Sequence, residues 1–165
     1  MKFLIFTLFL SFAAYPCTNM KNHLGKHKLH LSETFSTNKK TLFEWLSKTP
    51  NVAQWLGNFK SHQMSSDPKN PYGVGHIRKV EAPFVGITEE TITLSHSPDH
   101  IQYKVTKSKL MDTHLGDMCL SSLGPKKTLL KWTISFNSNY FYAKFVHLYL
   151  KLMLKRLKYN LPASK

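Results

Sequence analysis

The chain has 165 residues, which suits one domain that buries its core without disulfides. Its two cysteines, Cys17 and Cys119, lack the spacing of a metal site. The formal net charge of +14 favours an anionic partner such as phospholipid head groups, nucleic acid or an acidic ligand. No acidic residue follows Asp117, so the positive charge is concentrated in the last third of the chain.

The N-terminal residues differ from the rest of the chain. Lys2 precedes an apolar run that ends at Ala14, and small residues around Ala13 suit a signal peptidase. The run is shorter than the about 20 apolar residues of a membrane-spanning helix. Residues 1–19 are therefore predicted to be a secretory signal, and the protein to be periplasmic or secreted. The alternative is a true start at Met20, which would make residues 1–19 a misannotated extension of a cytoplasmic protein.

The next segments predict one strand and two short helices. Residues 27–35 alternate loosely between apolar and polar, as in a strand. Ser36, Thr37 and Asn38 offer N-cap side chains for a helix over residues 39–48. A cap followed by Pro50 starts a shorter helix that ends before Gly57. A strand followed directly by two short helices is an unusual order of elements, which helps to identify the fold.

The remaining segments predict an antiparallel sheet and a long helix. Strand patterns separated by turn signals cover residues 59–64, 74–80, 87–95, 100–106, 114–122 and 128–136. Residues 139–160 form a helical segment without glycine or proline. Short turns favour a meander, which twists and curls around the final helix. The predicted class is therefore α+β, with an apolar cavity between the sheet and the long helix.

The final helix carries two stripes at helical spacing. The apolar stripe, which is expected to face the cavity, consists of Phe141, Phe145, Leu148 and Leu152. The basic stripe, which is either a solvated face or a contact to an anionic membrane, consists of Lys144, His147, Lys151, Lys155 and Lys158. Further apolar residues surround the helix, so it is enclosed by protein or touches a second apolar medium.

Several segments together resemble the START-like SRPBCC superfamily, in its polyketide cyclase/dehydrase and lipid-transport branch. The matching features are TFSTNKKTLFEWLSKTPNVAQWLGNF, GHIRKV, EETITL, SPDHIQYKV, HLGDMCL and TLLKWTISF. The order and spacing of these features carry the resemblance, which covers residues 28–160. It implies a helix-grip fold with a hydrophobic cavity. It does not imply one chemistry, because the superfamily includes carriers, binders and enzymes.

The candidate site residues follow from strand alternation. Glu90 and His114 are expected on the cavity side, where such a pair could transfer a proton. The alternative is a solvated or ion-paired carboxylate and a structural histidine. Tyr103, Trp132 and Phe136 are expected to line the cavity or to be plain core. Arg78 is a candidate anchor for a ligand carboxylate or phosphate.

The sequence therefore predicts a protein that binds or carries a hydrophobic small molecule or lipid in its interior. The alternative is a cyclase or dehydrase acting on a ligand in the same cavity. No phosphate loop, metal cluster or nucleophile motif is recognisable, so no cofactor and no metal are expected. Nucleic acid is not the expected partner, because the aromatic residues do not alternate with basic ones. The sequence does not indicate an oligomeric state.

Overall fold

The computed structural model describes residues 25–82, 86–109 and 111–162. Its elements, in chain order, are β1 (His27–Phe35), α1 (Lys39–Ser47), α2 (Thr49–Leu56), β2 (Asn58–Gln63), β3 (Ile77–Ala82), β4 (Gly86–His96), β5 (His100–Lys107), β6 (Asp112–Gly124), β7 (Lys127–Asn137) and α3 (Tyr140–Asn160). This is the predicted α+β order. The predicted signal in residues 1–19 lies outside the described residues. None of the described helices has the length and apolarity needed to cross a membrane.

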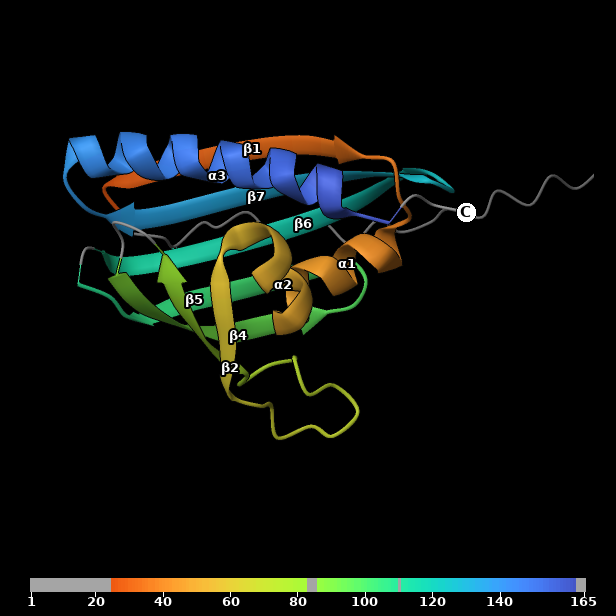
Figure 1. Cartoon of the computed structure of the whole chain (residues 1–165), viewed down its shortest axis with the longest axis horizontal. Helices are drawn as coiled ribbons and strands as arrows, with labels where there is room; N and C mark the ends of the chain where they lie inside the picture. Colours follow the sequence, from red (N-terminus) through yellow and green to blue (C-terminus); the bar gives the residue numbers. More distant parts are fainter. Residues whose placement is uncertain (1–24, 83–85, 110, 163–165) are drawn as a thin grey trace, which may run out of the picture.

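The seven strands form one antiparallel sheet in the order β1-β7-β6-β5-β4-β3-β2. Strands β2 to β7 are a meander, and β1 joins its far edge by pairing with β7, where His27 lies opposite Phe136. The first strand therefore becomes an edge of the sheet beside the last strand. Figure 1 shows all three described helices on one face of the curved sheet, with α3 lying along β1 and β7.

Side-chain caps start two of the helices, and the sequence predicts the first of these caps. Asn38 accepts a hydrogen bond from the Thr41 backbone N–H at 2.9 Å, and Asn139 accepts one from Tyr142 at 2.9 Å. The start of α2 differs, because its N-cap has no side-chain hydrogen bond. The hydroxyl of Thr49 instead lies 2.8 Å from Nε2 of His76, a buried residue just before β3. Thr49 therefore ties α2 to the sheet.

The long helix buries a different face from the predicted one. Its buried side chains are Ala143, Val146, Leu150, Leu154 and Leu157, at spacings of three, four, four and three. The predicted cavity stripe points outward, with exposed fractions of 83% for Phe141, 37% for Phe145, 61% for Leu148 and 50% for Leu152. The prediction was wrong because apolar residues surround this helix, so its periodicity fits more than one inward face.

Contacts with α2 select the buried face of α3. The hydroxyl of Tyr149 donates a hydrogen bond to the Leu56 carbonyl at 2.5 Å. Near the other end of the helix, the side-chain amide of Asn160 donates to the Gln54 carbonyl at 2.8 Å. Because these bonds join residues far apart in the sequence, local patterns do not reveal them.

Gly116 makes room for the most buried tyrosine. In the β5–β6 register Gly116 lies opposite Tyr103, whose side chain is 3% exposed. A Cβ atom added to Gly116 would lie 2.1 Å from Cζ of the Tyr103 ring. The ring therefore lies across the glycine, and any larger residue at position 116 must displace it.

Gly116→Ala is accordingly expected to lower the free energy of unfolding by about 2–3 kcal/mol, the upper part of the range for overpacked cores. Urea denaturation measures this loss. In a Tyr103→Leu background the same substitution should cost less than about 1 kcal/mol, because the ring that it meets is gone. Equal losses in the two backgrounds would contradict the explanation.

Candidate functional site

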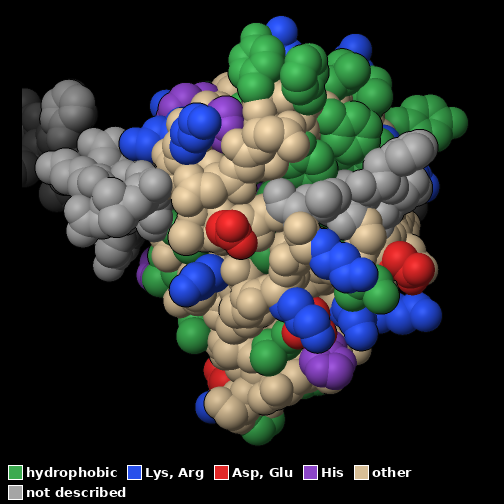
Figure 2. Space-filling model, turned by 90° about the vertical axis from the view of Figure 1, so that its left-hand side faces the viewer, with side chains coloured by type: hydrophobic (Ala, Val, Ile, Leu, Met, Phe, Trp, Pro, Cys, Tyr) green, Lys and Arg blue, Asp and Glu red, His purple; other side chains and the backbone are tan. Residues whose placement is uncertain are grey.

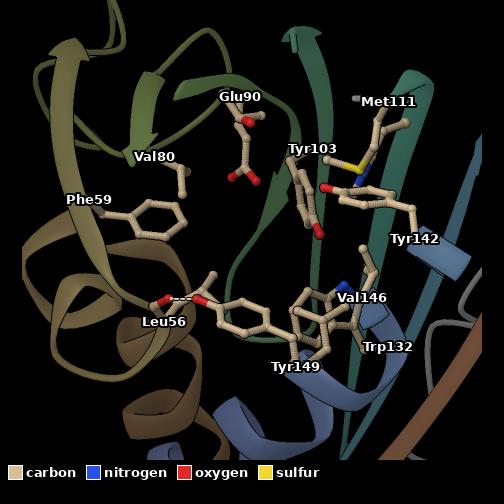
Figure 3. A pocket seen from close by; sticks show the side chains of 13 residues that line it. Leu56, Phe59, Val80, Glu90, Tyr103, Met111, Trp132, Tyr142, Val146 and Tyr149 are labelled. Carbon is tan, nitrogen blue, oxygen red and sulfur yellow. Dashed lines mark hydrogen bonds between the residues drawn. The ribbon is translucent and has the colours of Figure 1, made fainter. Parts of the chain in front are cut away.

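A pocket of about 70 Å³ lies between the sheet and the helices α2 and α3 (Figure 3). Its walls are mostly apolar, with Leu56, Phe59 and Val80 on one side and Val146, Tyr149 and Leu150 from α3 on another. Pockets for drug-sized ligands measure roughly 300–1,000 Å³. An apolar cavity of roughly 150 Å³ holds benzene. The space in this structure therefore fits a chemical group and not a whole lipid.

His114 forms part of the polar wall of this pocket. Its ring contacts Tyr103 and Phe136, with centroids 5.6 and 5.9 Å apart, and burial lowers its pKa to about 4. The imidazole is therefore neutral near pH 7. Its Nδ1 lies 3.2 Å from the sulfur of Met111, which can only accept, so Nδ1 carries the proton. Nε2 is then a buried acceptor without a partner among the described residues.

Three potential donors line the same pocket: the hydroxyls of Thr88 and Tyr142 and the indole N–H of Trp132. Burial raises the pKa of Tyr142 to about 12, and its hydroxyl is a buried group without a hydrogen-bond partner among the described residues. Burial raises the pKa of Tyr103, and the nearby indole N–H of Trp132 opposes this rise. The indole N–H nevertheless makes no hydrogen bond among the described residues. Figure 3 shows Tyr103, Tyr142 and Trp132 gathered on one side of the pocket. Buried polar groups usually have partners, so this side is incomplete without one.

The predicted anion anchor is already occupied by protein groups. Arg78 is 1% exposed, and its Nε donates to Glu90 at 2.7 Å. Another guanidinium nitrogen donates to the Leu46 carbonyl at 3.3 Å, and the group lies over the rings of Phe59 and Tyr103. Because Glu90 neutralises this charge, the prediction that Arg78 anchors a ligand anion was wrong.

The predicted acid–base pair is not joined in the structure. Glu90 and His114 both line the pocket, from β4 and β6. Within the described ranges no hydrogen bond or ion pair connects them, because β5 runs between their strands and Glu90 bonds Arg78. The ion-paired carboxylate and the packed histidine are the alternative that the sequence left open.

The other predicted cavity residues lie in three different parts of the structure. Tyr103 and Trp132 lie in the pocket wall. Phe136 is fully buried and stacks behind His114. The stripe of Phe141, Phe145, Leu148 and Leu152 lies on the outer side of α3, outside this pocket.

Sequence reasoning missed the whole α3 wall of the pocket. Tyr142, Val146, Tyr149 and Leu150 supply it, at spacings of four, three and one. The spacings of four and three between Tyr142, Val146 and Tyr149 equal those that begin the predicted stripe, so a signal was present in the sequence. No local feature of the sequence indicated which of the two stripes faces the pocket.

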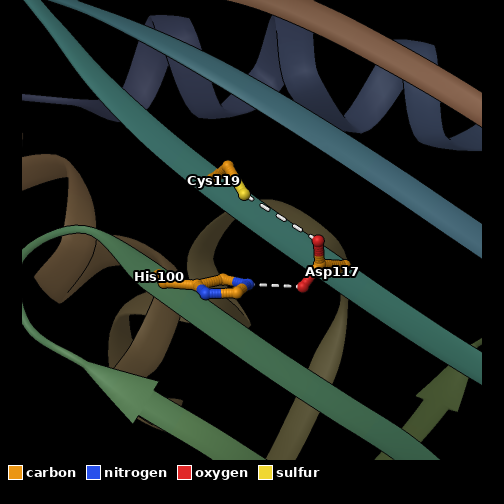
Figure 4. A group of neighbouring side chains, drawn as sticks. All are labelled: His100, Asp117 and Cys119. Carbon is orange, nitrogen blue, oxygen red and sulfur yellow. Dashed lines mark hydrogen bonds and ion pairs between the residues drawn. The ribbon is translucent and has the colours of Figure 1, made fainter. Parts of the chain in front are cut away.

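A second cluster of polar side chains lies on β5 and β6 (Figure 4). Nε2 of His100 and a carboxylate oxygen of Asp117 are 2.5 Å apart, and the sulfur of Cys119 lies 3.8 Å from the other oxygen. These residue types can hold a metal ion, and their candidate ligand atoms lie within 4.8 Å of one another. Cys119 is disulfide-bonded, however, so it offers no thiolate. The cluster is therefore a part-buried His–Asp contact beside a disulfide.

Known proteins resemble this chain in structure but not in sequence. No protein-family model and no curated protein matches the chain. Among solved structures, a START superfamily protein of Mycobacterium smegmatis has a TM-score of 0.69 at 12% identity, covering 82% of this chain and 97% of that one.

Two further structures give a similar result. The Aha1 protein of Colwellia psychrerythraea, solved as a dimer, has a TM-score of 0.64 at 13% identity, covering 82% of this chain and 96% of that one. A protein of Chromobacterium violaceum has a TM-score of 0.62 at 15% identity, covering 81% and 96%. At such identities the likeness concerns the fold alone. The chain therefore has the helix-grip fold of the START-like SRPBCC superfamily.

Proposed function

We propose that this protein binds an apolar small molecule that carries a neutral hydroxyl group. The observation that carries the proposal is the mismatch inside the pocket, whose walls are apolar except for a few buried polar atoms without protein partners. A ligand with a complementary group would satisfy them, whereas leaving them unpaired costs free energy.

The chemistry of the unpaired atoms favours a hydroxyl. Nε2 of the neutral His114 needs a donor, whereas the indole N–H of Trp132 needs an acceptor. A hydroxyl supplies both roles, while a carbonyl oxygen only accepts. A carboxylate would bring a second negative charge beside Glu90, and Arg78 is already paired with that residue.

The size of the pocket sets the way a ligand is held. A space of about 70 Å³ takes the hydroxyl end and a short apolar part. A lipid or another long ligand therefore requires the pocket to enlarge, for example by movement of the α3 wall that Val146 and Tyr149 supply.

A matched series of probes tests the proposal: 1-octanol, octanoate and octane, titrated into isotope-labelled protein. The reporters are the indole N–H resonance of Trp132 and the backbone amides of β6. We expect 1-octanol to bind about five- to tenfold more tightly than the other two, since one satisfied buried hydrogen bond is worth about 1–1.5 kcal/mol.

Two variants localise the effect. Tyr142→Phe removes a hydroxyl without a partner and should weaken 1-octanol binding without changing that of octane. Tyr149→Phe is the matched control, because its hydroxyl lines the same pocket but already bonds Leu56. Equal binding of all three probes would refute the hydroxyl preference, and binding of none of them would refute the expectation that this pocket opens to hold an eight-carbon ligand.

Catalysis receives no comparable support from the geometry. A cyclase or dehydrase needs a positioned acid or base with a pKa near the working pH. Glu90 is ion-paired with Arg78, and the pKa of His114 lies far below 7 because the ring is buried. Binding is therefore the function that the described residues favour.

A further inference from the structure

The outer side of α3 is an exposed apolar ridge. It consists of Phe141, Phe145, Leu148, Leu152 and Tyr159, with exposed fractions between 37% and 90%. Figure 2 shows hydrophobic side chains gathered at the top of the molecule, over the end of α3 that begins at Tyr140. Single exposed apolar residues are ordinary, but a continuous ridge along a helix marks an interaction surface.

Lysines flank this ridge along one side. Lys144, Lys151 and Lys155 are exposed and project from the same helix, which contains no acidic residue. Lys158 of the predicted basic stripe differs, because it donates to Glu33 of β1 at 2.8 Å. The charges available to a partner along this edge are therefore those of Lys144, Lys151 and Lys155.

A groove of about 420 Å³ continues the ridge toward β1. Leu148 and Leu152 form part of its apolar wall, and Lys151 and Lys155 also line it. The β1 side of the groove is more polar and holds Glu33, whose charge is paired with Lys158. The α3 side, with leucines beside lysines, matches a molecule that has an acyl chain and a negative head group. The groove thus extends the amphipathic pattern of the ridge.

We propose that the outer face of α3 docks on the surface of an anionic phospholipid membrane. The ridge enters the boundary between head groups and acyl chains, and the three lysines contact the phosphates. The opposite side of the helix packs into the protein core, so α3 lies along the membrane without crossing it. This contact is separate from ligand binding in the pocket and does not depend on it.

The charges favour a membrane over a second copy of the chain. In an antiparallel symmetric dimer through this ridge, the two rows of lysines would lie on the same side and approach one another, with no carboxylate on either helix to pair with them. Like charges placed together in an interface are unfavourable. An anionic membrane supplies the missing negative charge.

Vesicle co-sedimentation tests the proposal with the full chain. The vesicles are phosphatidylcholine alone and phosphatidylcholine mixed with phosphatidylserine, each at low and high salt. We expect binding to the mixed vesicles to exceed binding to the neutral ones and to weaken with salt. In the variant Lys144→Gln/Lys151→Gln/Lys155→Gln, the partition coefficient onto mixed vesicles should fall on the order of 100-fold, since each lysine contributes roughly fivefold.

A matched control removes the same charge elsewhere. Lys60→Gln/Lys104→Gln/Lys107→Gln changes three exposed lysines of β2 and β5, and it should leave the partition coefficient unchanged. The variant Phe141→Ser/Leu148→Ser keeps all charges and should also lose binding. Any apolar contribution of the N-terminal run is common to all four proteins, so it cancels in the comparison.

Three results would overturn the proposal. Equal binding to neutral and mixed vesicles would contradict the proposed contact between the lysines and the anionic lipids. An equal loss in the two lysine variants would indicate general attraction by net charge. A dimer in analytical ultracentrifugation that dissociates in the Phe141→Ser/Leu148→Ser variant would show that the ridge binds a second copy instead.

Discussion

Glu90→Gln is expected to lower the free energy of unfolding by about 3–5 kcal/mol, the usual cost of breaking a buried ion pair from one side. The substitution leaves the Arg78 guanidinium, which is 1% exposed, without its counter-charge. The neighbouring Leu46 carbonyl and the rings of Phe59 and Tyr103 stabilise a cation only in part. Urea denaturation at neutral pH measures the loss.

A double-mutant cycle separates the ion pair from its surroundings. Arg78→Met should be about as costly as Glu90→Gln, because it leaves a carboxylate that is 8% exposed without a partner. The double variant Arg78→Met/Glu90→Gln should recover much of the loss, since no unpaired charge remains buried. The matched control is Lys48→Gln, which breaks the exposed pair with Glu44 and should cost less than about 1 kcal/mol. If the single losses simply add in the double variant, the pair is not coupled as described.

The stability of the protein is expected to fall as the pH decreases from about 6.5 to about 4, because of His114. Burial lowers the pKa of this histidine to about 4 in the folded state, against an ordinary value of 6.5. In this range the unfolded chain takes up a proton that the folded chain does not, so protonation favours unfolding. The contribution of His114 is complete above pH 6.5 and is lost on the way down to pH 4. The full change is about 3 kcal/mol.

Replacement of the ring isolates this contribution. His114→Phe keeps an aromatic side chain between Tyr103 and Phe136 but cannot take up a proton. Urea midpoints measured between pH 4 and 7 should depend less on pH in this variant than in the wild type. Burial also lowers the pKa of His76, so a smaller dependence of the same sign should remain. His62→Phe, which changes an exposed histidine of β2, should keep the full dependence. An unchanged pH dependence in His114→Phe would exclude this role for the ring.

The order and type of the elements could be read from the sequence because local signals determine them. The first strand, the Asn38 cap and the alternating β7 segment each depend on residues close to one another in the chain. The residue types lining the strands were informative for the same reason, since alternation placed Glu90, Tyr103, His114 and Trp132 toward one side of the sheet. These four side chains do meet at one pocket.

The partners of those side chains were decided only by the tertiary structure. Arg78 and Glu90 come together through the β3–β4 register, which turned an expected ligand anchor into an internal ion pair. The inward face of α3 depended on α2, through the bond from Tyr149 to Leu56. A helix that is apolar around its circumference satisfies the same periodicity in several rotations. The free energy that selects one rotation comes from packing against residues distant in the sequence, and that selection left Phe141, Leu148 and Leu152 on the surface.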